Sequence, residues 1–167
     1  MARISDLTLK HQLFVRTYRF RRLDPIPWAP LGKPLRECRV ALVTTAAFYL
    51  EGMDPFEESL KGGDASFRVL AVRETDGSAA ADLRRLLIGH RSTAFDAAGI
   101  EADYNLALPV ERCIELESDG VIGRLHEEAL SFMGSITAPG CLVKETAPGA
   151  AERLKAGGVD AVLLTPV

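Results

Sequence analysis

Several features that would reveal a function at once are missing from this 167-residue sequence. No apolar run reaches the roughly 18 residues that a membrane-spanning helix needs, and the N-terminal segment has no continuous apolar signal region. The 20 basic and 23 acidic residues are interspersed and leave a net charge of -3, which attracts neither nucleic acid nor an anionic membrane. The sequence therefore predicts a cytoplasmic protein with no nucleic-acid or membrane partner.

Cysteine and histidine are also scarce, with three residues of each. Cys38, Cys113 and Cys141 are far apart and form neither a C-x-x-C redox pair nor a zinc-binding pattern, so no spacing indicates a metal site. The patterns G-x-G-x-x-G, G-x-x-x-x-G-K-[ST] and G-x-S-x-G are missing as well. Dinucleotide binding, P-loop hydrolysis and α/β-hydrolase chemistry therefore lose their usual support.

The residues that are present predict an α/β domain. An apolar fraction of 47% is enough to build a core. Apolar β-branched runs predict strands at 39–47, 67–72, 130–133 and 159–165, and helical spacing predicts helices at 9–22, from Val110 to Asp119-Gly120, and from Thr146 to Gly157-Gly158. The leucine spacing at 79–89 favours a helix, with a strand at 83–89 as the alternative, and 124–128 fits a short helical turn. This alternation predicts a Rossmann-like, open, mostly parallel sheet with flanking helices, whose sheet is incomplete.

A proline-rich stretch divides the chain. Four prolines lie within residues 24–35, where they fix the backbone and remove hydrogen-bond donors. We expect residues 1–36 to form an N-terminal helix and an extended arm, and residues 37–167 to form the α/β domain. The basic helix at 9–22 fits packing on its own mildly acidic domain, which we favour, or contact with a membrane surface or an acidic partner.

Two threonines end the first predicted strand. In open α/β sheets, ligands bind in the crevice beyond the carboxyl ends of the strands. Thr44 and Thr45 are therefore candidate substrate-binding residues with hydroxyl donors at that edge. The alternative is that threonine is simply well suited to a strand.

Several stretches, in this order, resemble the glycine/sarcosine/betaine/D-proline reductase family, in particular its selenoprotein B or B-type subunits. They are RRLDPIPWAPLGKPL (21–35), VALVTTAAFYL (40–50), GDASFRV (63–69), ADYNLALPVER (102–112), DGVIGRLHEEALSFMGSI (119–136) and ETAPGAAERLKAGGVDAVLLTPV (145–167). The most specific part is the succession of SFMG, ETAP and GVDAVLLTPV. Together these stretches cover most of the chain.

The resemblance has a consequence for the final strand. In the family, the strand that corresponds to VDAVLLTPV (159–167) leads directly into a redox residue, which is a selenocysteine or a cysteine. This implies that the chain is the N-terminal portion of a B-type subunit, that no catalytic nucleophile lies within it, and that the nucleophile is expected immediately after Val167. A UGA codon decoded as selenocysteine would end the reading frame there; a trimmed sequence and a natural short homologue are the alternatives.

The resemblance also implies a chemistry and a set of partners. In the glycine, sarcosine and betaine reductases, a selenolate attacks the α-carbon of the substrate and displaces the amine, and the carboxymethyl group passes from selenium to a carrier selenoprotein. The implied substrate is a small amino acid or a betaine-like molecule. The implied partners are that carrier and a subunit bearing a pyruvoyl group, with no cofactor in this chain. An unpaired apolar edge at 159–167 would also favour a homo-oligomer.

Three further residues become candidates through the resemblance. His90 aligns with a histidine-containing segment of the family and is a candidate helper in catalysis, with a solvated loop histidine as the alternative. Asp103 and Asn105 match the family's D-x-N and are candidates to bind substrate or orient His90, with a local Asx turn as the alternative. If the chain has no catalytic role, it is a non-catalytic interaction module or a small-ligand-binding module that uses Thr44, Thr45, Asp103 and Asn105.

Overall fold

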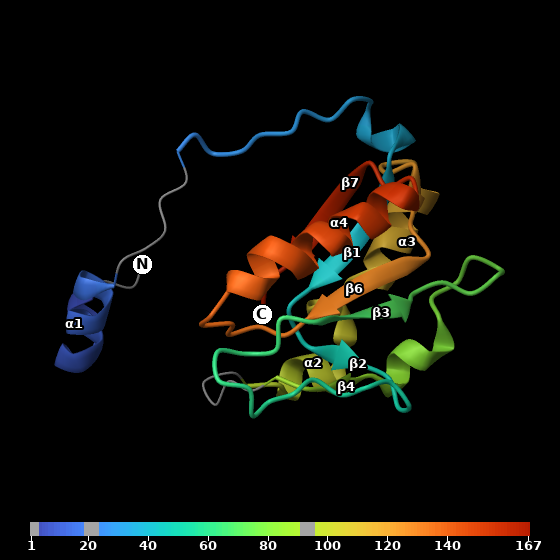
Figure 1. Cartoon of the computed structure of the whole chain (residues 1–167). Helices are drawn as coiled ribbons and strands as arrows, with labels where there is room; N and C mark the ends of the chain where they lie inside the picture. The colour runs from blue at the N-terminus through green and yellow to red at the C-terminus, as the bar shows by residue number, and fades with distance from the viewer. Residues whose placement is uncertain (1–3, 19–23, 91–95) are drawn as a thin grey trace. The chain divides into compact units, whose positions relative to one another are not determined.

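The computed structural model describes residues 4–18, 24–90 and 96–167 (Figure 1). The chain divides into two compact units, Met1–Pro30 and Leu31–Val167. The first unit contains a short 3₁₀ turn, η1 (Ile4–Asp6), and helix α1 (Leu9–Thr17), which buries none of its side chains. Helix α1 ends where Tyr18 turns to extended backbone, so it is shorter than the predicted helix, whose residues 19–22 lie outside the described ranges.

The second unit is built on a mixed, mostly parallel sheet. Its strands are β1 (Arg39–Thr44), β3 (Phe67–Ala71), β5 (Arg124–Leu125), β6 (Glu128–Phe132) and β7 (Ala161–Thr165). Strand β1 is central and pairs in parallel with β5, β6 and β7, whereas β3 pairs antiparallel with β6. The predicted open α/β fold with a mostly parallel sheet is confirmed.

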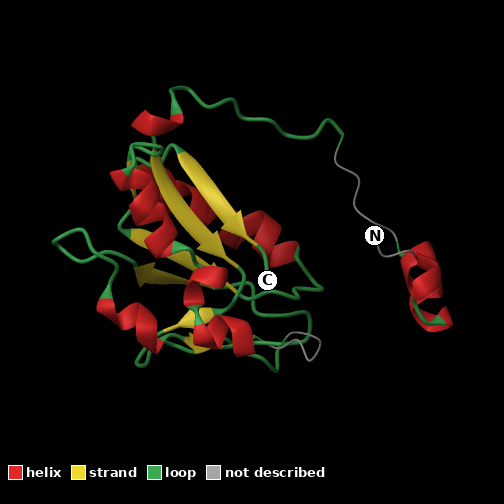
Figure 2. Cartoon of the chain, turned by 180° about the vertical axis from the view of Figure 1, so that it is seen from behind, coloured by secondary structure: helices red, strands yellow, loops and turns green. Residues whose placement is uncertain are grey.

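Helices cover both faces of this sheet. Successive side chains of a strand point to opposite faces, and in β1 they enter two separate core clusters. Val40 and Leu42 pack in the cluster that contains α3 (Val110–Ser118), while Ala41 packs in the cluster that contains α4 (Ala147–Ala156). Figure 1 shows α4 in front of the sheet with α3 behind it, and Figure 2 gives the reverse view. The burial of β1 on both faces explains its continuous apolar sequence.

Shorter elements complete the second unit. They are η2 (Leu35–Glu37), β2 (Phe48–Tyr49), η3 (Ala81–Arg85), β4 (Leu87–Ile88), α2 (Ala98–Ala102), η4 (Tyr104–Leu106) and η5 (Leu142–Thr146), of which η5 is a π-helical turn that leads into α4. Strands β2 and β4 form a small antiparallel ribbon.

Two local predictions were wrong in part. Residues 79–89 do not form one helix: they contain the 3₁₀ turn η3 and the strand β4, because Leu87 and Ile88 pair with β2. The strand that the sequence offered as the alternative at 83–89 is therefore present over two residues. Residues 124–128 are not a helical turn either. The amides of Leu125 and His126 donate to the Glu117 side chain and to the Val40 carbonyl, so this segment is held as a strand beside β1.

The outer side of β7 is apolar and open to solvent. Among the described strands, β7 pairs with β1 alone. Its central residues Val162, Leu163 and Leu164 are 41%, 44% and 67% exposed. An apolar groove follows the strand on the side of α4 and is lined by Ala147, Ala151 and Leu154 among others. An exposed apolar edge of this kind is a surface on which another strand can pair.

One arginine fastens the loop between β2 and β3. Arg68 Nε donates to the Asp54 carbonyl at 2.6 Å and Nη2 donates to the Pro55 carbonyl at 2.8 Å. Its Nη1 donates to Ser66 Oγ at 2.8 Å, and the guanidinium lies 4.3 Å from the centre of the Phe56 ring. The guanidinium of Arg68 thus binds the carbonyls of Asp54 and Pro55, which lie in the loop and have no partner in the main sheet.

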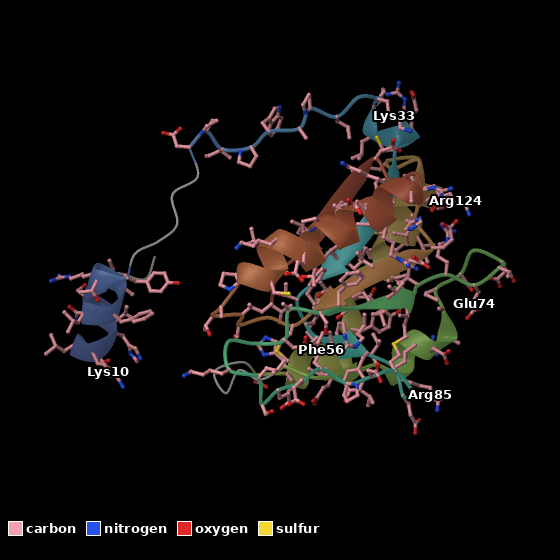
Figure 3. The ribbon with its side chains drawn as sticks, viewed as in Figure 1. Lys10, Lys33, Phe56, Glu74, Arg85 and Arg124 are labelled. Carbon is pink, nitrogen blue, oxygen red and sulfur yellow. The ribbon has the colours of Figure 1, made fainter. Side chains whose placement is uncertain are left out.

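We expect Arg68→Lys to destabilise the fold although it keeps the charge, because one ammonium cannot replace a fork that reaches two carbonyls and a hydroxyl. The expected loss in the free energy of unfolding is about 1.5–3 kcal/mol, as for hydrogen bonds to charged groups. Urea denaturation measures it. Arg85→Lys is the matched control, because the Arg85 side chain points outward (Figure 3) and is 71% exposed, whereas the Arg68 side chain is 14% exposed. Equal denaturation midpoints for the two variants would contradict the assignment.

Candidate functional site

The carboxyl ends of the parallel strands meet at one edge of the sheet. Thr44 of β1 is in register with Ser131 of β6 and with Thr165 of β7. Beyond these pairs, Ala46 forms a bridge with Met133. The three strand ends therefore bring together Thr45, Gly134 and Val167, which are far apart in the sequence. This is the edge at which open α/β sheets bind ligands.

The two predicted threonines fasten the end of β7 to β1. Thr44 is fully buried; its hydroxyl donates to the Thr165 carbonyl at 3.4 Å and accepts from the Ala46 amide at 3.2 Å. The Thr45 hydroxyl accepts from the Val167 amide at 2.9 Å, and the Thr45 amide donates to the Thr165 carbonyl at 3.2 Å. Thr45 is half-buried and so borders solvent, as Thr44 does not. Substrate binding by either hydroxyl stays a prediction.

A third threonine, Thr165, joins this edge to the segment before α3. Its hydroxyl donates to the Ala107 carbonyl at 2.6 Å and lies 3.2 Å from the Val43 carbonyl. Ala107 directly follows η4, so the end of this turn is bonded to the end of β7. The bond explains how a segment remote in sequence comes to this edge.

Asp103 and Asn105 hold each other and the start of α3. Asp103 Oδ1 accepts from the Asn105 amide at 2.9 Å and from Asn105 Nδ2 at 3.1 Å. Asn105 Oδ1 in turn accepts from the Glu111 amide at 3.1 Å, in the first turn of α3. Among the described residues, the side-chain hydrogen bonds of Asp103 and Asn105 lie within the segment up to Glu111 and do not reach Thr45 or His90. The Asx turn that the sequence offered as an alternative is present. A role in substrate binding stays a prediction for both residues.

His90 lies at the same edge as Thr45 and Val167. It follows β4, and the amide of the preceding Gly89 donates to the Ala47 carbonyl at 3.0 Å. A β-carbon built on Gly134 would lie 2.5 Å from His90 Nε2 and 3.1 Å from the carbonyl oxygens of both Thr45 and Val167. The imidazole and the ends of β1 and β7 therefore converge on one glycine.

The surroundings of His90 lower its pKa below the usual value of 6.5. Burial is the main cause, because it disfavours the charged imidazolium, and a hydrogen bond to the Val167 backbone acts in the opposite direction. The ring is therefore neutral at pH 7 and can accept a proton. A neutral imidazole beside the end of a strand is suited to general-base chemistry.

Two residues in left-handed conformation also mark this edge. Ala47 follows β1 with a φ of 55°, and Ser135 follows β6 with a φ of 56°. Non-glycine residues adopt such angles rarely, and they do so most often where the surrounding structure imposes them. Neither angle could be predicted from the sequence, which also did not single out Gly134 or Thr165 as site residues. The glycine that ends the strand in SFMG was the available signal for Gly134.

The described cysteine and metal-ligand side chains provide no comparable reactive site. Burial raises the pKa of the Cys113 thiol, which keeps it protonated and weakly nucleophilic. Within residues 4–18, 24–90 and 96–167, no group of three or more His, Cys, Asp or Glu side chains is arranged to hold a metal ion. The helices of these same ranges are all too short or too polar to cross a bilayer.

Fold and edge together define an open α/β protein with a candidate small-molecule site at the carboxyl ends of its parallel strands. The chain belongs to the glycine/sarcosine/betaine reductase selenoprotein B family, whose family model matches residues 6–167. The family that the sequence motifs resemble is thereby confirmed. No solved structure is significantly similar to this chain.

Relatives of known function are reductase subunits. The chain is 32% identical over 162 residues to the D-proline reductase subunit gamma of Acetoanaerobium sticklandii, which covers 97% of this chain and 62% of that protein. It is 31% identical over 160 residues to the glycine reductase complex component B subunit gamma of Symbiobacterium thermophilum, covering 94% of this chain and 35% of that subunit. It is 30% identical over 172 residues to the betaine reductase complex component B subunit beta of Peptoclostridium acidaminophilum, covering 98% and 36%. The chain thus spans about a third to three-fifths of these proteins.

The lowered pKa of His90 predicts a pH dependence of stability. Between the pKa of the folded chain and the unfolded value of 6.5, the unfolded chain binds more protons at this residue. The stability contributed by neutral His90 is therefore complete above pH 6.5 and falls as the pH drops through this window. Urea denaturation of wild type and His90→Gln at a series of pH values isolates this contribution as the difference between the two curves. Parallel curves through the window would show that His90 is not desolvated.

Proposed function

We propose that this chain is the N-terminal portion of a B-type reductase subunit, and that its carboxyl strand edge positions a selenocysteine or cysteine that follows Val167. The reaction is reductive C–N cleavage of a small amino acid or a betaine-like substrate. The observation that carries the proposal is the anchoring of Val167. Its amide is bound by the Thr45 hydroxyl at 2.9 Å, and its carbonyl lies beside Gly134 and His90.

This anchoring supports a nucleophile at the next position for a geometric reason. Strand β7 runs parallel to β1, so the polypeptide after Val167 begins in the crevice beyond the strand ends. A residue that follows an anchored one has few accessible positions. Its side chain therefore starts within reach of the same edge, where a substrate held by Thr45 would present its α-carbon.

His90 supplies the acid-base function in this proposal. A thiol or selenol attacks carbon only as the anion. The neutral imidazole beside Val167 accepts the proton of the chalcogen, and its conjugate acid can return that proton to the departing amine. Thr45 is the hydroxyl at the edge that borders solvent, and we assign it to the substrate carboxylate.

We also propose that this chain functions within a reductase complex of several subunits. The relatives named above are subunits of D-proline, glycine and betaine reductases, two of them named as parts of complexes. We infer that this chain works with a subunit that carries a pyruvoyl group and with a carrier selenoprotein. The exposed apolar residues of β7, Val162, Leu163 and Leu164, offer a surface for assembly.

A second candidate function is a non-catalytic module that binds a partner or a ligand without turnover. One observation favours it: the hydroxyls of Thr44, Thr45 and Thr165 already bond to backbone groups of the chain itself. Such bonds suit a structural role of the edge as well as a catalytic one.

Reading the nucleotides after the Val167 codon, and then testing the encoded residue, distinguishes these functions. We expect a UGA or cysteine codon, followed in frame by further α/β sequence. With cysteine at that position, iodoacetamide should alkylate the thiol more slowly in His90→Gln than in wild type at pH 7, because the acceptor of the thiol proton is lost. His126→Gln is the matched control, since that histidine packs against Gly157, at the start of β7 rather than its end.

Two outcomes of this experiment contradict the reductase proposal. One is a continuing frame without selenocysteine or cysteine close behind Val167. The other is an alkylation rate that is the same in wild type, His90→Gln and His126→Gln, because the imidazole would then have no influence on the nucleophile.

Substrate binding is tested separately by thermal denaturation with glycine, sarcosine, betaine and D-proline. A ligand that binds only the folded chain raises its Tm, so we expect an increase with at least one of the four. The increase should be smaller in Thr45→Val and retained in Thr45→Ser, which keeps the hydroxyl. If none of the four changes the Tm of wild type, the chain acts as an interaction module rather than as a substrate-binding domain.

A further inference from the structure

Gly134 occupies a position where the backbone does not require glycine. It directly follows Met133, which bridges to Ala46, and the Ala47 amide donates to the Phe132 carbonyl at 2.9 Å. Six glycines among the described residues have a positive φ, and Gly134 is not one of them. Any L-residue could therefore adopt its backbone conformation. The reason for glycine must lie in the space around its Cα atom.

That space is filled by the candidate site itself. A β-carbon on Gly134 would lie 2.5 Å from His90 Nε2, much closer than the roughly 3.5 Å at which such atoms pack. The next neighbours are the carbonyl oxygens of Thr45 and Val167, both at 3.1 Å. Hydrogen bonds between Thr45 and Val167 hold these two segments in place. The imidazole is the neighbour that can move, so a side chain at 134 would displace His90 first.

We propose that Gly134 is a positioning residue of the site: the absence of a side chain at 134 allows the His90 ring to lie against the carboxyl end of β7. The functional meaning of this contact rests on the proposed reductase function, in which His90 serves a nucleophile that follows Val167. The contact itself is a property of the domain. It is therefore measurable whether or not the proposed nucleophile exists.

The fold contains a matched control at its opposite edge. Gly157 ends α4, and a β-carbon there would lie 2.7 Å from His126 Cε1 and 3.0 Å from His126 Nε2. Its φ of -75° is also ordinary. Gly157→Ala therefore also places a methyl group against a histidine ring, but near the amino end of β7, whereas Gly134 lies near its carboxyl end.

The test is an NMR titration of the histidine Cε1–H signals in wild type, Gly134→Ala and Gly157→Ala. In Gly134→Ala we expect the ring of His90 to move toward solvent, so that its pKa rises toward 6.5 as burial is relieved. Gly157→Ala should perturb the His126 signal and leave that of His90 in place. A His90 signal and pKa in folded Gly134→Ala identical to those of wild type would overturn the proposal.

A double-mutant comparison keeps the test decisive if Gly134→Ala folds poorly. If the methyl group acts through the imidazole, Gly134→Ala should lower the denaturation midpoint less in a His90→Ala background than in wild type. An equal decrease in both backgrounds would mean that the methyl group acts on the backbone instead, and the proposal would be wrong.

The two hypotheses fail in different ways. Loss of the His90 effect on alkylation, with the expected titration in Gly134→Ala, would remove the reductase proposal and leave the positioning role intact. If His90→Gln slows alkylation but the titration of His90 is unchanged in Gly134→Ala, His90 remains a catalytic helper and Gly134 does not position it. When both hold, alkylation in Gly134→Ala should slow toward the rate of His90→Gln, while Gly157→Ala alkylates at the wild-type rate.

Discussion

The parallel register of β7 on β1 is the constraint on which the site depends. Five consecutive pairs, from Val40 with Ala161 to Thr44 with Thr165, align segments that are more than a hundred residues apart in sequence. A slip of one residue would turn every side chain of β7 to the other face. It would also separate the Val167 amide from the Thr45 hydroxyl and move Val167 away from His90. One strand pairing thus sets both the core and the edge.

Strand β7 is fixed at both ends by different forces. At its start, Asp160 forms an ion pair with Lys33 at 2.8 Å and accepts a hydrogen bond from the Arg39 amide, also at 2.8 Å. At its end, the hydroxyls of Thr44 and Thr45 perform that function. Salt screens surface ion pairs but has little effect on hydrogen bonds between uncharged groups, so the end near the candidate site is held by the less salt-sensitive contacts. The outer side between these anchors remains open to a partner.

The sequence predicted correctly those strands and helices that are long enough to show a hydrophobic pattern of their own. The continuous apolar runs gave β1, β3, β6 and β7, and helical spacing with glycine stops gave α3 and α4. Strands β2 and β5 were not predicted, and β4 only as the alternative to a helix, because each has two residues and forms only by pairing with another strand. Thr44 and Thr45 were predicted for the strand end, but their bonds to β7 depend on tertiary register. Gly134 was missed for a related reason, since its significance lies in neighbours supplied by three other segments.

The groups at this edge also limit what the domain can contribute to catalysis. An anion placed just beyond Val167 would meet the carbonyl oxygens of Thr45 and Val167, whose partial charges are negative, and an imidazole that is neutral at pH 7. The two carbonyl oxygens disfavour a thiolate or a selenolate, and the imidazole stabilises the anion only after it has taken the chalcogen's proton and become cationic, which its burial disfavours. In the proposed reductase, the positive electrostatic potential that such a nucleophile needs must come from polypeptide outside these residues, such as the N-terminus of a following helix. On that proposal the domain would orient the nucleophile and exchange its proton, while another element would stabilise its charge; the relatives are longer than the matched segment.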